Sequence, residues 1–225
     1  MSDKEMHGEP KTDANFNQGC GILFVLSAPS GTGKTTLANY LVNHLPDMIR
    51  SISYTTRKIR GGEKEGVDYH FVDHATFEKM IEEKAFAEYA KVHDNYYGTA
   101  LKTITEAKDH GDDILLVIDV QGAATLANQN LDSVSIFLLP PSMKELRERL
   151  GNRGTDSEEA INKRIKTALK EIEACGNYDY IVVNDKLSKT EGNLAGIVWA
   201  ERCKTHRNNT VFSDYSLPTQ IKGKK

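Results

Sequence analysis

Residues 22–36 read Ile22-Leu23-Phe24-Val25-Leu26-Ser27-Ala28-Pro29-Ser30-Gly31-Thr32-Gly33-Lys34-Thr35-Thr36 and decide the fold. The five apolar residues at the start predict a buried strand, and the residues from Lys34 onward predict a helix over 34–45. The small residues between them allow successive backbone N–H groups to converge on phosphate oxygens, as in a phosphate-binding loop. Ala28 stands where this pattern usually has its first glycine.

The roles in such a loop follow from its chemistry. Lys34 can reach the terminal phosphates of a nucleoside triphosphate, and the hydroxyl of Thr35 can bind Mg²⁺. The helix that follows adds the favourable field of its N-terminus. We therefore expect the triphosphate to be bound by Ala28, Pro29, Ser30, Gly31, Thr32, Gly33, Lys34, Thr35 and Thr36.

The chain has 225 residues, enough for one domain with a buried core and a small inserted part. Its formal charge of -3 argues against nucleic acid or an anionic membrane surface as its main partner. The three cysteines, Cys20, Cys175 and Cys203, lack the spacing of zinc ligands and favour reduced thiols. The longest apolar run, 114–118, is too short to span a bilayer. We expect a soluble cytoplasmic protein, and its oligomeric state stays open.

Strand-like and helix-like stretches alternate along most of the chain, which is typical of a parallel sheet covered by helices. The predicted strands are 21–27, 113–119, 133–139 and 179–184, and the predicted helices are 34–45, 121–129, 142–151, 157–175 and 188–204. Residues 51–99, rich in Thr, Tyr, Arg and Gly, interrupt this alternation and predict a small mixed insertion. The polar, aperiodic ends, 1–19 and 207–225, are expected to be a flexible extension and a tail.

The insertion contains a second candidate anion site. Arg57 and Arg60 lie in the loop Ser53-Tyr54-Thr55-Thr56-Arg57-Lys58-Ile59-Arg60-Gly61-Gly62-Glu63, among several hydroxyls. The planar guanidinium binds phosphate oxygens in a bidentate way and keeps its charge. By itself this loop also fits a solvated surface segment.

Together, the phosphate-binding loop, the loop of Arg57 and Arg60, and Asn95-Tyr96-Tyr97-Gly98 resemble the guanylate kinase family in order and spacing, over about 21–206. The resemblance implies an α/β fold: a three-layer P-loop core with a parallel sheet (20–50 and 100–206), a GMP-binding insertion (51–99) and a short lid (about 147–164). It also implies transfer of the γ-phosphate from ATP to GMP with Mg²⁺.

The resemblance also implies the acceptor site. Its phosphate would be held by Ser53, Arg57, Arg60, Tyr69 and Tyr97, and its guanine by Glu88 and Thr99. Guanine presents N1–H and N2–H side by side, so one carboxylate can accept both, whereas adenine presents an acceptor at N1. From the residues alone, Glu88 also fits a surface carboxylate, and the two tyrosines also fit packing aromatics.

Asp119 follows the buried strand Ile114-Leu115-Leu116-Val117-Ile118, where a carboxylate would help Thr35 to position Mg²⁺ through water. The alternative is an ordinary helix N-cap. The family often has an acidic residue two positions earlier, where this chain has Val117. Asp119 is therefore the sole carboxylate on that strand face.

The stretch 147–157 resembles the family's lid, and the resemblance implies that Arg153 and Arg164 stabilise the transferring phosphoryl group together with Lys34, Arg57 and Arg60. A charged helix surface explains Arg147 and Arg149 equally well. Asn184, in the run Tyr180-Ile181-Val182-Val183-Asn184-Asp185, is implied to bind the ATP base, although Asn is also a common turn residue.

Two other functions fit the resemblance. One is a non-catalytic guanylate-kinase-like module that binds a phosphorylated protein, and the other is a P-loop kinase with a different acceptor. The intact Gly33-Lys34-Thr35 and the lid arginines favour the enzyme over the module. Glu88 with Thr99 argues against another acceptor.

Overall fold

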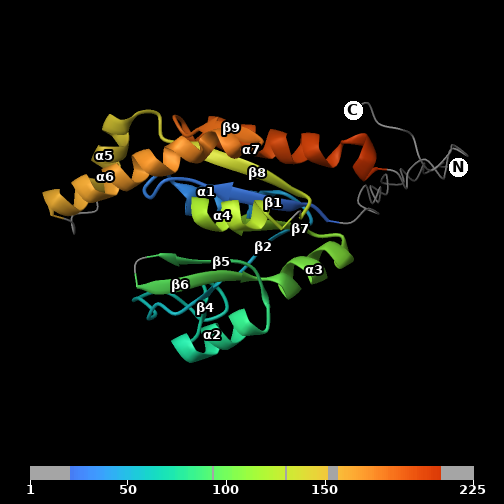
Figure 1. The fold of residues 1–225 in the computed structure, drawn as a ribbon. Helices are drawn as coiled ribbons and strands as arrows, with labels where there is room; N and C mark the ends of the chain where they lie inside the picture. Colours follow the sequence, from blue (N-terminus) through green and yellow to red (C-terminus); the bar gives the residue numbers. More distant parts are fainter. Residues whose placement is uncertain (1–20, 93, 130, 152–156, 209–225) are drawn as a thin grey trace, which may run out of the picture.

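The computed structural model describes residues 21–92, 94–129, 131–151 and 157–208. The predictions for the extension 1–19, for Cys20, for Arg153 and for most of the tail lie outside these ranges. The described part of the chain contains two sheets. One has five strands in the order β2-β7-β1-β8-β9, and the other has four strands in the order β4-β3-β6-β5. The smaller sheet and its helix α2 lie beneath the larger sheet in Figure 1.

The larger sheet is built around β1 (Leu23–Ser27), all of whose residues are buried. It pairs in parallel with β7 (Asp113–Val117) on one side and with β8 (Ser133–Leu139) on the other. Outside them lie β2 (Met48–Arg50) and β9 (Tyr180–Val183), also parallel. Every strand therefore ends at the same edge of the sheet, the edge where the phosphate-binding loop begins.

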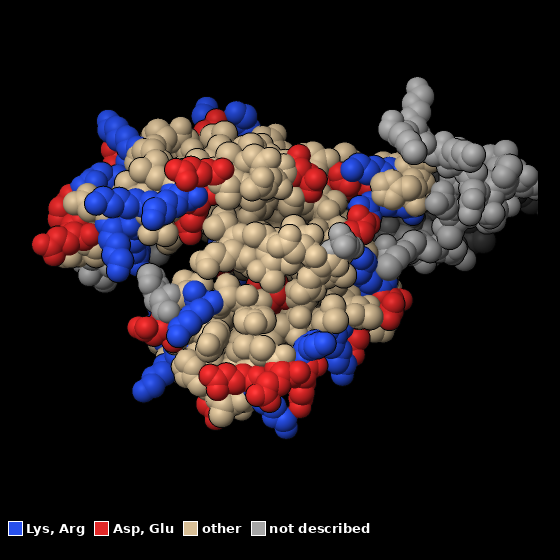
Figure 2. All heavy atoms as spheres, viewed as in Figure 1, with Lys and Arg blue, Asp and Glu red and all other residues tan. Residues whose placement is uncertain are grey.

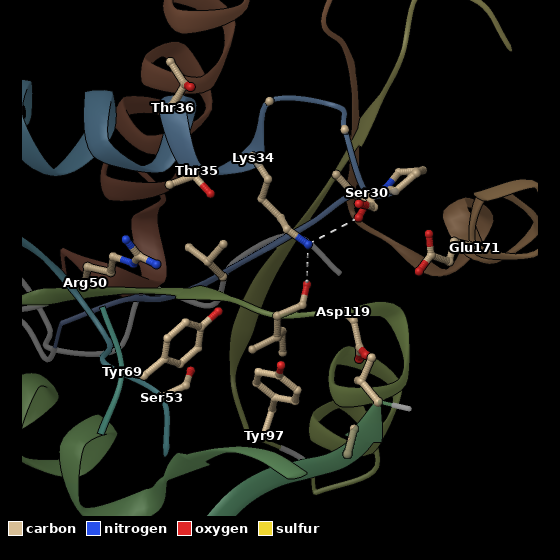
Figure 3. Close-up of a pocket in the computed structure, with 18 of the residues that line it drawn as sticks. Ser30, Lys34, Thr35, Thr36, Arg50, Ser53, Tyr69, Tyr97, Asp119 and Glu171 are labelled. Atoms are coloured by element: carbon tan, nitrogen blue, oxygen red, sulfur yellow. Dashed lines mark hydrogen bonds between the residues drawn. The ribbon is translucent and has the colours of Figure 1, made fainter. Parts of the chain in front are cut away.

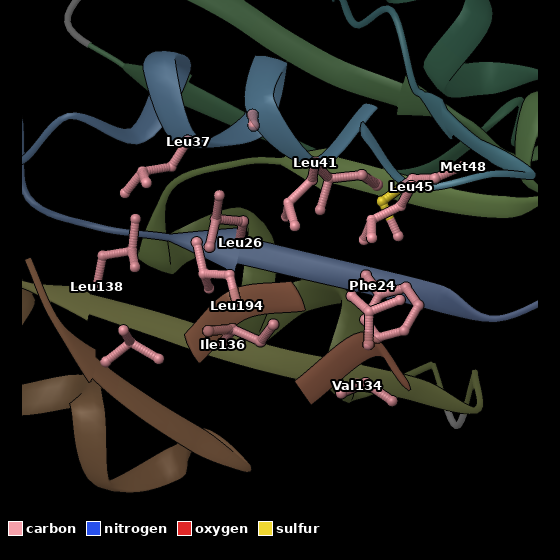
Figure 4. Close-up of a cluster of buried hydrophobic side chains, with 14 of the residues drawn as sticks. Phe24, Leu26, Leu37, Leu41, Leu45, Met48, Val134, Ile136, Leu138 and Leu194 are labelled. Carbon is pink, nitrogen blue, oxygen red and sulfur yellow. The ribbon is translucent and has the colours of Figure 1, made fainter. Parts of the chain in front are cut away.

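Alternate residues of β1 face opposite sides of this sheet, and all of them are buried. Helices therefore cover both faces. Phe24 and Leu26 pack in one cluster with residues of α1 (Lys34–His44) and α7 (Leu187–Arg202), as Figure 4 shows. Leu23 and Val25 pack with residues of α3 (Leu101–His110) and α4 (Val120–Ala127). The prediction of a three-layer α/β core is confirmed.

Two further helices pack together at one end of the core, α5 (Met143–Gly151) and α6 (Glu158–Glu173). Leu146 and Leu150 are buried against Ala168 between them. A 3-10 turn, η1 (Ala174–Asn177), leads from α6 to β9, and another, η2 (Thr205–Arg207), follows α7. The end of α5 and the start of α6 fall within the predicted lid (about 147–164), whose residues 152–156 lie outside the described ranges.

The smaller sheet consists of β3 (Tyr54–Thr55), β4 (His70–Phe71), β5 (Phe86–Val92) and β6 (Asn95–Ala100). The β3–β4 pair is parallel and the others are antiparallel. Phe77 of α2 (His74–Glu82) stacks on Phe86, with ring centroids 4.4 Å apart. Ala87 of β5 belongs to the same core cluster as Leu23 of β1, which joins the insertion to the larger sheet.

The predicted strands and helices of the core are present, with ends shifted by a few residues. The sequence did not predict β2, which has three residues. It also did not predict α3, in which only Ile104 and Ala107 are buried, so that the apolar pattern is weak. None of the helices in the described ranges is long and apolar enough to cross a membrane.

A buried ion pair ties the last long helix to the centre of the sheet. Arg202 donates through Nε to Asp113 Oδ2 (2.7 Å) and through Nη2 to the carbonyl of Pro46 (2.6 Å). The other oxygen of Asp113 accepts from the backbone N–H of Ile22 (2.8 Å). The two side chains are 7% and 2% exposed, so each charge depends on the other.

We expect Arg202→Met to lower the free energy of unfolding by about 3–5 kcal/mol, because it leaves Asp113 buried without its cation. Urea denaturation measures this loss. The control is Lys79→Met, which breaks the exposed Lys79–Glu83 pair (3.8 Å) and should cost less than about 1 kcal/mol. Equal losses in the two variants would contradict the role of the buried pair.

Candidate active site

A cavity of about 510 Å³ lies between the loop that follows β1 and the smaller sheet. Figure 2 shows charged side chains of both signs gathered over α5 and α6 at one side of this region. The cavity is lined by Ala28, Pro29, Ser30, Gly31, Gly33, Lys34, Thr35, Thr36, Arg50, Ser53, Tyr69, Glu88, Ala90, Val92, Tyr97, Val117, Ile118, Asp119 and Glu171. The cavity therefore brings the predicted phosphate-binding loop together with several predicted acceptor residues.

The loop depends on two glycines in the left-handed region of backbone conformation. Gly31 has φ 90° and Gly33, which N-caps α1, has φ 95°. A Cβ on Gly31 would lie 2.9 Å from Leu150 Cδ2, and one on Gly33 would lie 2.8 Å from Asn184 Nδ2. Both conformation and space therefore require glycine here.

Lys34 extends from the first turn of α1 into the cavity (Figure 3). Its Nζ donates to the carbonyls of Ala28 (3.3 Å) and Ile118 (3.4 Å). Burial lowers the pKa of Lys34, while the charges of Asp119 and Glu171 act in the opposite direction. The ammonium group is thus held in a partly desolvated position, where a phosphate would stabilise its charged form.

Asp119 is the N-cap of α4, since its Oδ1 accepts from the backbone N–H of Gly122 (2.8 Å). The N-cap interpretation is confirmed, and the same carboxylate also lines the cavity. Within the described ranges, no group of three His, Cys, Asp or Glu side chains could hold a metal ion. A metal role for Asp119 with Thr35 stays a prediction.

Glu88 lies on β5 and is 4% exposed, so the alternative of a surface carboxylate is wrong. Its Oε1 accepts from the hydroxyl of Thr99 (2.6 Å), which is fully buried on β6. Burial raises the pKa of Glu88 to about 7, opposed by the hydrogen bond from Thr99. A Cβ on Gly122 would lie 2.4 Å from Glu88 Oε2, so the backbone of α4 fixes the carboxylate from the other side.

Ser53, Tyr69 and Tyr97 line the cavity, whereas the two predicted arginines of the insertion do not. The rings of Tyr69 and Tyr97 also pack edge to face, with centroids 5.9 Å apart. The two residues are thus both packing aromatics and part of the cavity lining. Arg57 forms a bidentate pair with Glu63 (2.7 and 3.0 Å). Arg60 is exposed.

Among the described residues, Asn184 and Arg164 are predicted site residues that do not line the cavity. Asn184 donates through Nδ2 to the carbonyl of Thr32 (2.7 Å) and so holds the phosphate-binding loop, and its contact with a base stays a prediction. Arg164 lies on α6 outside the lining, and Arg153 lies outside the described residues. Arg147 pairs with Glu158, and Arg149 pairs with Glu145 (3.2 Å), as expected of a charged helix surface.

Sequence reasoning missed two charged lining residues, Arg50 and Glu171. Arg50 is the last residue of β2, directly before the insertion, but the sequence did not predict this short strand and so gave no signal for Arg50. Glu171 belongs to the polar helix α6, where nothing in the sequence distinguishes it from its charged neighbours. Burial raises the pKa of Glu171, while the charge of Lys34 lowers it.

Comparisons with known proteins agree on one family. The family model described as "Guanylate kinase" matches residues 21–201. A guanylate kinase of Syntrophotalea carbinolica is 51% identical over 187 residues, covering 83% of this chain and 89% of the relative. One from Myxococcus xanthus is 48% identical over 188 residues, covering 83% and 90%. The crystal structure of guanylate kinase from Anaplasma phagocytophilum superposes with a TM-score of 0.73 at 36% identity, covering 89% of this chain and 98% of that chain.

The raised pKa of Glu88 predicts a pH-dependent stability. Because its pKa is about 7 when folded and 4.5 ordinarily, the protonated form favours the fold. This contribution is present below about pH 4.5 and is lost as the pH rises through 7, a loss of about 3 kcal/mol at 1.4 kcal/mol per unit. Glu88→Gln should therefore gain stability relative to the unmodified protein between about pH 5 and pH 8.

Urea denaturation at a series of pH values measures this difference. The exposed Glu78→Gln is the control and should give a difference that does not change with pH. A difference for Glu88→Gln that is equally flat would show that the Glu88 carboxyl group titrates as it does in the unfolded chain.

Proposed function

The chain belongs to the guanylate kinase family, and we propose that its cavity binds ATP and GMP and transfers the γ-phosphate to give ADP and GDP. The observation that carries the proposal is the arrangement of Lys34 and Glu88 on one cavity. Lys34 belongs to the loop that binds the donor, and Glu88 belongs to the insertion that reads the acceptor. The reaction is an ATP:GMP phosphotransfer.

The acceptor's base is selected by hydrogen bonding. The ionised Glu88 accepts from N1–H and N2–H of guanine, and Thr99 holds the carboxylate in place. Adenine offers an acceptor at N1 and no amine at C2, so its binding would leave the buried carboxylate without donors. Such unpaired polar groups give large discrimination between substrates.

The acceptor's phosphate is bound beside Ser53, Tyr69 and Tyr97, which line the cavity. Arg57 and Arg60 supply positive charge to this end of the site. Glu63 holds the guanidinium of Arg57 in one orientation, 5.3 Å from the centre of the Tyr69 ring. The ionised phosphate of GMP is itself a competent nucleophile, so positioning and electrostatics supply the rate enhancement.

The donor's phosphates are bound by the backbone N–H groups and hydroxyls of residues 28–36, with Lys34 at the terminal phosphates. Asn184 contacts the adenine base in addition to holding the loop. Arg153 and Arg164 stabilise the transferring group from the lid and help to exclude water.

Thr35 and Asp119 fit a Mg²⁺ ion that is bound partly through water. Both are oxygen donors lining the cavity, and only Oδ1 of Asp119 is used by the N-cap. Mg²⁺ keeps several waters and needs only one or two protein carboxylates when phosphates complete its shell. The ion would neutralise charge on the β- and γ-phosphate oxygens.

The substrates place the protein in purine nucleotide metabolism and fit a cytoplasmic location. The binding-module alternative requires an insertion that binds phosphate without turnover. The lysine in the phosphate-binding loop favours the enzyme, because a module has no need of a buried cation at a donor site.

We expect a coupled assay of ADP release with ATP and Mg²⁺ to show turnover with GMP, and at least about 10³-fold lower kcat/KM with AMP, CMP or UMP. Lys34→Ala should lower kcat about 10²–10³-fold, because a charge aimed at the transferring group is lost. Glu88→Ala should raise the KM for GMP and remove the preference for guanine. Binding of GMP without turnover would instead identify the binding module.

Gly122→Ala tests the fixed position of the Glu88 carboxylate. The added methyl group must displace Oε2, so the KM for GMP should rise about 10- to 100-fold while the KM for ATP stays unchanged. The matched control is Gly192→Ala in α7, where a Cβ meets nothing within 4 Å. An unchanged KM for GMP in Gly122→Ala would argue against the carboxylate as the guanine acceptor.

A further inference from the structure

We propose that Arg50 is a further binding residue of this site and that its guanidinium contacts the phosphate of GMP. The inference rests on the proposed function and adds to it a residue that sequence reasoning did not single out. Four observations carry it: the place of Arg50 in the sheet, its few partners, its neighbours in the cavity and the position of the other arginines.

Arg50 is directed into the cavity by the geometry of β2. Met48 and Arg50 are two residues apart and share a face of the strand. Met48 is buried in the cluster beneath α1, and Arg50 continues that face past the end of the cluster. This is also the carboxyl edge of a parallel sheet, where ligands of α/β proteins bind.

The guanidinium of Arg50 has few partners. Its Nη1 donates to Asn39 Oδ1 at 3.5 Å, the upper limit for a hydrogen bond, and its Nε is buried without a partner among the described residues. Arg57 and Arg202, in contrast, each pair with a carboxylate at 2.7 Å. A partly desolvated cation with no anion is costly. A phosphate oxygen in the cavity would offset that cost.

The neighbours of Arg50 place it between the two substrates. In Figure 3 its guanidinium lies between Thr35, at the donor end, and Tyr69, at the acceptor end, with Ser53 close by. Burial raises the pKa of Tyr69, and the positive charges of Arg57 and, to a smaller extent, of Arg50 act in the opposite direction. Asp119 and Glu171 lie on the far side of Lys34 in the same view. The side of the cavity near Arg50 is thus the electropositive one.

The other arginines of the described residues do not line the cavity. Arg57 is held by Glu63, Arg60 is exposed, and neither lines the cavity. Among the described residues that line it, Arg50 is the one arginine. Its planar fork can bind two oxygens of one phosphate, which a lysine cannot do.

The test compares the binding of GMP with that of guanosine, which lacks the phosphate, by calorimetry on the whole protein. Arg50→Gln should weaken GMP binding about 10- to 100-fold, the loss of a charged hydrogen bond pair, and leave guanosine binding unchanged. Arg50→Lys should restore part of the affinity for GMP. Lys58→Gln, an exposed cation of the insertion, is the control and should change neither.

Equal losses for GMP and guanosine, or no loss for either, would overturn the proposal. If Arg50→Gln does not fold, Arg50→Lys still tests the proposal. An unchanged ratio of the affinity for GMP to the affinity for guanosine in Arg50→Lys would contradict a bidentate contact. Absence of GMP phosphorylation by the unmodified protein would instead defeat the proposed function. Selective loss of GMP affinity in Arg50→Gln would still establish the contact.

Discussion

The central position of β1 is the constraint on which the site depends. Hydrogen bonds to β7 and β8 fix the strand on both sides, and its five residues are buried, so the loop that follows begins from a fixed point of the sheet. Because all strands of this sheet are parallel, their ends supply the surrounding groups as well. Asp119 follows β7, Arg50 ends β2 and Asn184 follows β9. Ligands of α/β proteins bind at such an edge for this reason.

The insertion places charged side chains opposite this edge of the sheet. Packing around them fixes their position and affects their ionisation. Thr99 and the backbone of α4 fix the carboxylate of Glu88, and burial brings its pKa close to neutrality. Glu63 fixes Arg57 in a similar way, over the ring of Tyr69, which lines the cavity. In the proposed function, a rigid acceptor for guanine and an oriented cation for phosphate would both be consequences of an ordered small sheet. Recognition here is therefore built into the folding of the insertion.

The sequence predicts most of the core, because its strands are continuous apolar runs that alternate with helix-like stretches. It predicts the phosphate-binding loop because the chemistry of that loop is local, whereas Glu88 is singled out only through the family resemblance, since from the residues alone it also fits a surface carboxylate. It does not predict α3, whose surface is mostly polar, or the capture of Arg57 by Glu63, which depends on how one loop closes. The sequence does not predict Arg50 and Glu171 as lining residues for a related reason. Each becomes significant only when strands or helices far apart in the sequence meet around one cavity.

The buried ion pair and hydrogen bonds of Arg202 have a consequence for how the protein folds while it is being synthesised. Arg202 ends α7, yet its partners are Asp113 and Pro46, and α7 also contributes Leu194 and Val198 to the cluster around Phe24. A nascent chain can cover part of this face with α1, but it cannot complete the cover until α7 has left the ribosome. For most of translation, the surface beneath α7 stays apolar and open, and chaperones can bind it during that time.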